Sequence, residues 1–356
     1  MKITEAKVFV TCPGRNFVTL KISTDEGVYG LGDATLNGRE LAVESYLADH
    51  LIPCLIGRDP FQTEDVWQYL YRGAYWRRGP VTMTAIAAVD MALWDIKGKA
   101  LGLPVWKLLG GGFHPKIRCY ASSLFGATPE KTGELARRYR DQGFTAVKFG
   151  WDPMGQDEKT DIALVREARK GLGDSADLLI DAGLVWDSKT ALQRARAFSE
   201  YNIYWLEEPL RPDDYDGYRK LAEATDVRIA AGEEESSRLS FIELMDRGRI
   251  DVVQVDLTRC GGFTEAMKIA ALAWDRGLPI ANHGFTTYIN VTAALHWLNS
   301  IPNALIAEFV TQENTNLREF LTRQKLRAHD GYLEMPQEPG LGIELDDEAI
   351  ARFRVS

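Results

Sequence analysis

The sequence predicts an α/β protein in which an α+β region is followed by a (β/α)8-type, TIM-like barrel of the (β/α)7β form. Two observations predict the barrel. Short apolar runs alternate with helical stretches after residue 112, and polar residues end nearly every run. Continuous apolar strands that alternate with helices are typical of a parallel sheet covered on both faces, and eight of them suit a closed barrel. The eight runs span residues 117–122, 146–150, 178–183, 204–209, 228–233, 252–257, 279–284 and 304–309.

The regions before and after these runs have different patterns. Residues 1 to about 35 alternate between apolar and polar side chains, as half-buried strands do, with a hairpin signal at 25–27. Helical spacing follows, and a small-residue stretch that ends at Gly102 predicts a long helix. We therefore expect an α+β domain over 1–112, the barrel over 113–328, and a tail over 329–356. The tail has strand and turn character and is expected to pack on the first domain.

Composition narrows the class of partner. The chain is 45% hydrophobic and 26% charged, which is typical of a globular protein with an ample core. Its net charge of −9 argues against nucleic acid and against anionic membrane surfaces as partners. The four cysteines form no C-x-x-C pair, and neither a signal peptide nor a membrane-spanning run is present in the sequence. We expect a cytoplasmic protein that binds a small molecule.

The polar residues at the strand ends recur with the period of one strand–helix unit. From Asp181 onward they lie 23 to 27 residues apart. In a barrel the carboxyl ends of the strands converge on one mouth, where such folds carry their chemistry. The predicted ring consists of Lys148, Asp181, Glu207, Glu233, Asp256, His283 and Glu308.

Three carboxylates on consecutive strands, Asp181, Glu207 and Glu233, would repel one another unless a cation lies among them. Oxygen ligands with room for water and substrate suit Mg²⁺ better than zinc, so we expect a magnesium site. Strand alternation allows either Glu233 or Glu235 as the third ligand, and the position of Glu233 at the strand end favours Glu233. The alternative is an ion-pair network with a basic side chain, for which Lys148 and Arg259 are the nearest basic residues at the strand ends.

The remaining ring residues suggest acid–base chemistry. Asp256 and His283 end neighbouring strands, and a carboxylate beside an imidazole fixes its tautomer and makes it a general base. Glu308 in a dry pocket is expected to stay protonated and to donate to an enediolate oxygen. Lys148 is expected to offset the carboxylate of the substrate. Together these groups predict proton abstraction next to a carboxylate, with the metal stabilising the enediolate.

Several stretches of the chain together resemble the enolase superfamily, mandelate racemase type. "AAVDMALWDIKGKALGLPVWKLLGG" is similar to the family's cap-to-barrel signature, "LLIDAG", "WLEEP" and "AAGEE" to its metal-ligand strands, and "VDLTRCGG" with "ANHGF" to its Asp–His dyad. The resemblance covers essentially the whole chain. It implies that the N-terminal region and the tail form a capping domain whose loops select the substrate. The expected substrate contacts are Arg15, Asn16, Asn37 and Arg259, and we expect a homo-oligomer.

Two departures from the family narrow the activity. Racemases and cycloisomerases of this type resemble one another in a Lys-x-Lys strand with a base on each face of the substrate, whereas this chain has Lys148-Phe149-Gly150. One base suits elimination, so we expect a Mg²⁺-dependent dehydratase that converts an aldonate, such as D-mannonate or D-gluconate, to a 2-keto-3-deoxy acid. A racemase or epimerase, and a sugar-acid-binding regulatory protein with little turnover, are the alternatives.

The second departure lies between the cap and the barrel. The cap resembles that of mannonate dehydratases, as in "CPGRNFVTLKI" and "GDATLNGRE". Those enzymes resemble one another in having an Arg at the position of Lys148, a Tyr-bearing insertion after that strand, and a His where this chain has Gly183. The barrel therefore leaves the sugar acid open.

Overall fold

The computed structural model describes residues 1–311 and 319–355. The N-terminal region begins with an antiparallel sheet of β1 (Ile3–Thr11), β2 (Phe17–Thr24) and β3 (Tyr29–Asp33), in that order. An apolar cluster joins this sheet to the helices that follow, which confirms the predicted α+β cap. The helices are α1 (Glu40–Ser45), the π-helical turn η1 (Tyr46–Leu51), α2 (Ile52–Leu55), α3 (Thr63–Gly73), α4 (Pro80–Leu101) and α5 (Val105–Leu108).

Strand β3 lies directly on helix α4 because of its two glycines. A Cβ added to Gly30 or Gly32 would lie 2.0 Å from the carbonyl oxygen of Ala92 or Ala88, respectively. Only glycine permits such a close approach of two backbones. Helix α4 ends as predicted at Gly102, whose φ of 67° terminates the helix. This packing brings the end of β3, at Asp33, close to the barrel.

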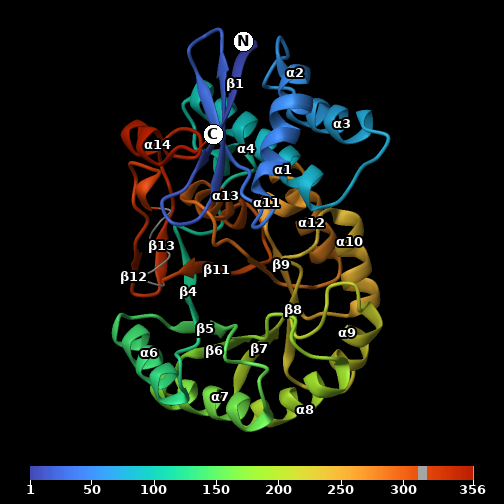
Figure 1. The fold of residues 1–356 in the computed structure, drawn as a ribbon, viewed down its shortest axis with the longest axis vertical. Helices are drawn as coiled ribbons and strands as arrows, with labels where there is room; N and C mark the ends of the chain where they lie inside the picture. Colours follow the sequence, from blue (N-terminus) through green and yellow to red (C-terminus); the bar gives the residue numbers. More distant parts are fainter. Residues whose placement is uncertain (312–318, 356) are drawn as a thin grey trace.

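The barrel consists of parallel strands that close on themselves through pairing of β11 with β4, which confirms the predicted (β/α)7β barrel. In the described residues its strands are β4 (Lys116–Leu124), β5 (Ala146–Gly150), β6 (Asp177–Asp181), β7 (Ile203–Glu207), β8 (Arg228–Ala231), β9 (Val252–Val255), β10 (Ile280–Asn282) and β11 (Ala304–Val310). The helices between them form the outer layer, with the cap at one end (Figure 1). They are α6 (Pro129–Asp141), α7 (Glu158–Leu172), α8 (Ser188–Ser199), α9 (Tyr215–Ala222), α10 (Arg238–Glu243) with η2 (Leu244–Gly248), α11 (Leu257–Cys260), α12 (Phe263–Asp275) and α13 (Tyr288–Asn299).

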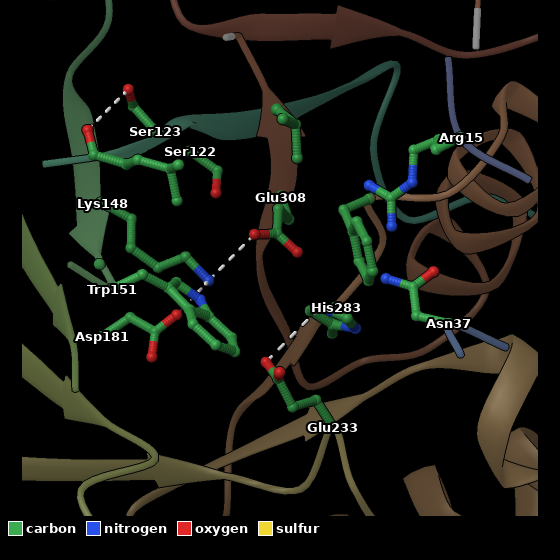
Figure 2. A pocket seen from close by; sticks show the side chains of 14 residues that line it. Arg15, Asn37, Ser122, Ser123, Lys148, Trp151, Asp181, Glu233, His283 and Glu308 are labelled. Carbon is green, nitrogen blue, oxygen red and sulfur yellow. Dashed lines mark hydrogen bonds and ion pairs between the residues drawn. The ribbon is translucent and has the colours of Figure 1, made fainter. Parts of the chain in front are cut away.

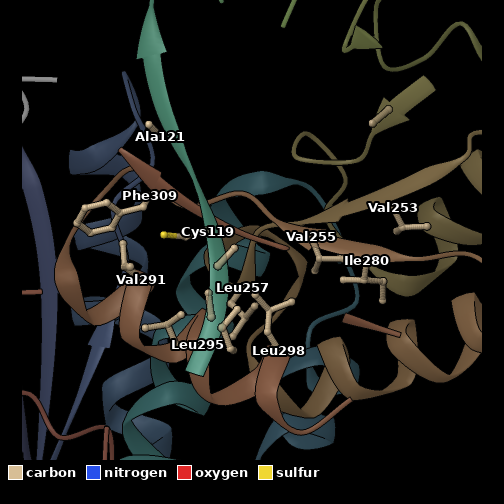
Figure 3. Close-up of a cluster of buried hydrophobic side chains, with 14 of the residues drawn as sticks. Cys119, Ala121, Val253, Val255, Leu257, Ile280, Val291, Leu295, Leu298 and Phe309 are labelled. Atoms are coloured by element: carbon tan, nitrogen blue, oxygen red, sulfur yellow. The ribbon is translucent and has the colours of Figure 1, made fainter. Parts of the chain in front are cut away.

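Alternate side chains of each strand point outward and inward, as a barrel requires. The outward set packs against the helices. Figure 3 shows Cys119 of β4 near Val291 and Leu295 of α13, all buried. The inward set forms a smaller cluster that fills the barrel, with Trp205 at its centre. This floor consists of Tyr120, Ala146, Leu179, Trp205, Ala230, Val252, Ala281 and Ile306.

The tail returns to the cap through backbone hydrogen bonds. The amide of Val355 donates to the carbonyl of Val10, and the amide of Cys12 donates to the carbonyl of Phe353, each at 2.8 Å. The strands β12 (Ala328–His329) and β13 (Tyr332–Glu334) extend the sheet beside β4. The end of the tail was predicted to be strand and turn, and this was wrong, because α14 (Asp347–Phe353) is a helix. The side chain of Asp346 caps the N-terminus of this helix, and acidic residues in its first turn interact favourably with the helix dipole. The domain boundaries at 112 and 328 stay predictions.

Within the described part of the chain, no helix has both the length and the apolar character needed to cross a bilayer.

Candidate active site

Strand register explains how the polar ring forms. Most of the eight residues of the apolar floor are followed, two positions later in the sequence, by a polar residue at the mouth end of the strand. Leu179 precedes Asp181, and Ala281 precedes His283 in this way. Because side chains alternate along a strand, all of these groups point into the barrel above the floor. Figure 2 shows Lys148, Asp181, Glu233, His283 and Glu308 facing one another across the mouth.

The mouth is a cavity of about 340 Å³ between the barrel and the cap. Two cap residues that were predicted to contact substrate, Arg15 and Asn37, line it. Five predicted ring residues, Lys148, Asp181, Glu233, His283 and Glu308, line it as well. The pattern of polar strand ends does not identify the other wall residues, because none of them is a strand-end acid or base. They are Ser122, Ser123, Leu124, Gly150, Trp151, Phe285 and Val310.

Two predicted substrate contacts, Asn16 and Arg259, are absent from the cavity lining. The guanidinium of Arg259 is buried and points to the cap, where its Nη1 donates to the carbonyl of Thr35 at 2.7 Å. The same Nη1 donates to the hydroxyl of Thr258 at 2.7 Å. This cation joins the barrel to the cap and does not line the cavity. The cavity-facing Trp151 has a φ of 67°, which is unusual for a large residue, and a Cβ added to Gly183 would lie 3.4 Å from its ring.

The ammonium group of Lys148 lies among three carboxylates. It is hydrogen-bonded to Glu207, lies 3.0 Å from Glu308 Oε1, and lies 4.0 Å from Asp181 Oδ2. Burial alone would lower the pKa of Lys148, but Glu207 and Glu308 raise it well above its ordinary value. The ion-pair network that the sequence offered as an alternative to a metal is therefore present. Glu207 is fully engaged, because its other oxygen accepts from the Trp205 indole at 2.9 Å.

The positive charge near the three predicted metal ligands does not offset the cost of burying them as carboxylates. Burial raises the pKa of Asp181 to about 6, although Lys148 opposes the shift. Burial likewise raises the pKa values of Glu207 and Glu233 to about 7. The Oε2 atom of Glu233 is buried and has no hydrogen-bond partner. As the described side chains stand, no group of three acidic, histidine or cysteine residues encloses a metal position. By donor type and by charge, the three carboxylates nevertheless suit a hard cation. For all three to bind one ion, Glu207 would have to turn away from Lys148.

The Asp256–His283 pair forms as the sequence predicted. Asp256 Oδ2 lies 2.8 Å from His283 Nδ1, and its Oδ1 accepts from the amide and hydroxyl of Thr258 at 2.7 and 2.6 Å. The other imidazole nitrogen, Nε2, lies 3.6 Å from Glu233 Oε2. Burial lowers the pKa of His283, but Glu233 and Asp256 raise it to about 10. The imidazole is therefore protonated on both nitrogens in this arrangement. It can act as a base only when another group balances the charge of Glu233.

Glu308 was expected to be a protonated acid, and this was wrong. Burial raises its pKa, but Lys148 and His283 outweigh burial and lower the pKa to about 2. Its Oε2 also accepts from the amide of Gly284 at 2.8 Å. The sequence could not show that the side chains of Lys148 and Glu308 meet. Glu308 is a carboxylate that holds Lys148 and the loop after β10.

The strand that carries Lys148 has no room for a second base. A Cβ added to Gly150 would lie 2.7 Å from the Cβ and 2.9 Å from Oδ2 of Asp181. Contacts under 3.0 Å essentially never occur for a real Cβ, so Asp181 would have to move. Any side chain at this position would displace a carboxylate of the ring.

The chain matches two families over most of its length. Residues 6–110 match the N-terminal domain of the mandelate racemase / muconate lactonizing enzyme family, and residues 131–349 match the enolase C-terminal domain-like family. The chain belongs to the enolase superfamily. A solved structure shares the fold of this chain over its full length. The 3,6-anhydro-D-galactonate cycloisomerase from Zobellia galactanivorans has a TM-score of 0.93 and 35% identity, with 100% of each chain covered.

Curated relatives in the superfamily are named as dehydratases. A D-mannonate dehydratase of Sphingomonas sp. (strain SKA58) is 41% identical over 99% of this chain and 94% of its own length. A D-galactonate dehydratase family member, ManD, of Chromohalobacter salexigens is 38% identical over 99% of this chain and 95% of its own length. The first alignment spans 389 positions although this chain has 356 residues, so that relative contains insertions that this chain lacks. With such relatives over nearly its full length, the chain is an enzyme of the hydro-lyase class.

Proposed function

We propose that this enzyme is a Mg²⁺-dependent dehydratase of a sugar acid, an aldonate such as D-mannonate or D-gluconate, and forms a 2-keto-3-deoxy acid. The observation that carries the proposal is the one-sided placement of the base. A single imidazole–carboxylate pair, His283 with Asp256, serves the cavity, and Gly150 cannot bear a second base without moving Asp181. Elimination needs one base, whereas racemisation needs a proton donor on each face of the substrate.

The residues divide the reaction between them. His283 Nε2 takes the proton from the carbon beside the substrate carboxylate, while Asp256 fixes the imidazole through Nδ1. Lys148 turns from Glu207 to the substrate carboxylate and balances its charge. The bond from the neighbouring carbon to its hydroxyl then breaks, and the hydroxyl leaves as water with the proton that His283 carries. The resulting enol rearranges to the 2-keto acid.

Asp181, Glu207 and Glu233 would hold the magnesium ion. When bound, the ion stabilises the negative charge that develops on the carboxylate side of the enediolate. The raised pKa values of these acids support this assignment, as does the Oε2 atom of Glu233, which is buried and makes no hydrogen bond. Arg15 and Asn37 reach the cavity from the cap and are proposed to contact the hydroxyl groups of the substrate.

The proposal is tested by incubating the enzyme with aldonic and aldaric acids and Mg²⁺, and by measuring the release of 2-keto acid. Release with at least one acid, abolished by EDTA and restored by Mg²⁺, is the expected result. Running the reaction in D₂O separates the alternatives. Deuterium at C2 of recovered substrate with inverted configuration and no keto acid would indicate an epimerase. Binding of acid without any product would indicate a regulatory protein.

A cycloisomerase is the second candidate, because a superfamily member with that name is 35% identical over the full length of both chains. The substrate in that name is an anhydro sugar acid, so the leaving oxygen would belong to a ring ether and no water would be released. Adding 3,6-anhydro-D-galactonate to the screen distinguishes the two. An isomer of unchanged mass would favour the cycloisomerase, and a product lighter by one water would favour the dehydratase.

A further inference from the structure

The end of cap strand β3 is bonded to the loop that carries the base. Asp33 is fully buried, and its Oδ2 accepts from the Thr286 hydroxyl at 2.6 Å, from the Thr287 hydroxyl at 2.7 Å and from the Thr287 amide at 3.1 Å. Its Oδ1 accepts from the amide of Thr35 at 2.8 Å. Thr286 and Thr287 lie between His283 and helix α13. One carboxylate of the cap thus fixes the short segment that follows the imidazole.

Two hydrogen-bonded routes lead to Asp256 from the residues that are bonded to Asp33: one starts at Thr286 and the other at Thr35. In the first, the Asn290 amide donates to the Thr286 hydroxyl at 3.2 Å and lies 3.5 Å from Asp256 Oδ1. In the second, Arg259 Nη1 donates to the carbonyl of Thr35 and to the hydroxyl of Thr258. The Thr258 hydroxyl in turn donates to Asp256 Oδ1. Both routes reach Oδ1, while Oδ2 holds His283. The cap therefore fixes the carboxylate from the side opposite the imidazole.

We propose that Asp33 is a positioning residue for the Asp256–His283 pair and acts through Thr286 and Thr287. This inference rests on the proposed function, in which His283 moves the proton. Removing the Asp33 carboxylate would leave buried donors of both threonines without an acceptor, which costs roughly 1–3 kcal/mol for each unsatisfied group. The loop can relieve that cost only by moving, and His283 moves with it. Small misplacements of a base lower the rate of the chemical step rather than the affinity for substrate.

The placement of Asp33 also links substrate and base. Asn37 lines the cavity four residues after Asp33, on the same connection between β3 and α1. A cap that is correctly seated over the substrate therefore also holds the base in line. The loop after β10 carries Phe285, whose ring lies 5.0 Å from the guanidinium of Arg15, a second cap residue of the cavity.

A matched control exists in the same region. Asp95 of α4 is as buried as Asp33, and it accepts from the amides of Leu31 and Leu341 at 2.9 and 2.8 Å. These partners, and Lys99 with them, all lie outside the cavity lining. Asp95→Asn should lower the melting temperature and leave kcat unchanged, as a purely structural carboxylate would.

The test compares Asp33→Asn, Thr286→Val and Thr286→Ser with the control. Asp33→Asn and Thr286→Val are expected to lower kcat for keto-acid release by about 10- to 100-fold with KM within about twofold, as other indirect positioning groups do. Thr286→Ser keeps the hydroxyl and is expected to restore most of the activity. Equal kcat in wild type, Asp33→Asn and Thr286→Val would overturn the proposal. Thr286→Val also decides the matter if Asp33→Asn does not fold.

Crystal structures of the variants give a readout that does not depend on activity. In Thr286→Val or Asp33→Asn the distance from His283 Nδ1 to Asp256 Oδ2 is expected to exceed about 3.5 Å, beyond hydrogen bonding. An unchanged contact in both variants would overturn the positioning role. If the wild type releases no keto acid from any sugar acid, the proposed function fails, while this measurement still decides the role of Asp33.

Discussion

Two histidines, His283 at the mouth and His296 in helix α13, are both buried, yet their environments drive their charges in opposite directions. His283 lies among carboxylates, and these raise its pKa to about 10 against the effect of burial. His296 lies against backbone groups, and burial lowers its pKa to about 4. Its Nδ1 accepts from the amide of Trp106, and Nε2 faces the carbonyl of Leu341, each at 3.2 Å. Neighbouring charge, and not depth alone, therefore separates a residue suited to proton transfer from one that holds the fold.

The largest effect is expected from removing the mouth histidine. His283→Asn keeps a polar side chain but cannot take the substrate proton, so kcat should fall by at least about 1,000-fold, within the range for loss of a general base. Mg²⁺ binding, measured by calorimetry, should persist, because the proposed ligands are untouched. His50→Asn, at an exposed histidine of the cap, is the matched control and should keep full activity. Retained turnover in His283→Asn would place the base elsewhere.

The next effect tests Lys148, the second buried cation of the mouth. Lys148→Met removes the buried ammonium from Glu207 and Glu308, and breaking such a pair typically costs about 3–5 kcal/mol of stability. Thermal unfolding in EDTA should show this loss, and added Mg²⁺ should recover part of it. Lys131→Met removes an exposed lysine that is paired with Glu134 and should change stability far less than Lys148→Met does. Equal losses in the two variants would contradict the buried network.

The buried His296 predicts a dependence of folding stability on pH, with a known sign. The pKa of His296 is about 4 when folded and 6.5 in its ordinary state, so the unfolded chain binds a proton that the folded chain does not. Stability from this group is complete above pH 6.5 and falls as the pH drops toward 4, by roughly 3 kcal/mol. Because acids in the mouth also titrate in this range, the measurement is the difference between wild type and His296→Asn in urea unfolding from pH 4 to 7. A difference that does not vary with pH would contradict the buried neutral imidazole.

The smallest effect tests how tightly the acidic side of the mouth is packed. Gly150→Ala adds one carbon against Asp181, so kcat should fall by about tenfold, with a stability loss of about 1–3 kcal/mol from overpacking. Gly73→Ala is the control, because an added Cβ there meets nothing within 4 Å at the end of helix α3. Full activity in the Gly150→Ala variant would show that Asp181 can move freely, and the argument against a second base would weaken.

The sequence predicted the barrel and five residues of the cavity wall because both follow from periodicity. A strand end every 23 to 27 residues fixes which side chains share the mouth. Periodicity could not identify Trp151 or Phe285, whose positions depend on loop conformation. It also could not show that Lys148 contacts Glu207 and Glu308, because such pairing depends on where long side chains end. The error on Glu308 arose for the same reason, since burial was weighed without the neighbouring cation.

Strand β4 has consequences for how the chain folds. It begins the barrel, yet it pairs with β11 and β13, and the amide of Thr311 bonds to the carbonyl of Ser122 across 189 positions. In the same way, β1 near the start of the chain bonds to Val355 near its end. During synthesis on the ribosome, both early strands must therefore wait with an unpaired edge until nearly the whole polypeptide has emerged. Such long sequence separations slow folding and expose the nascent chain to aggregation, so efficient production should depend on chaperones and on lower growth temperature.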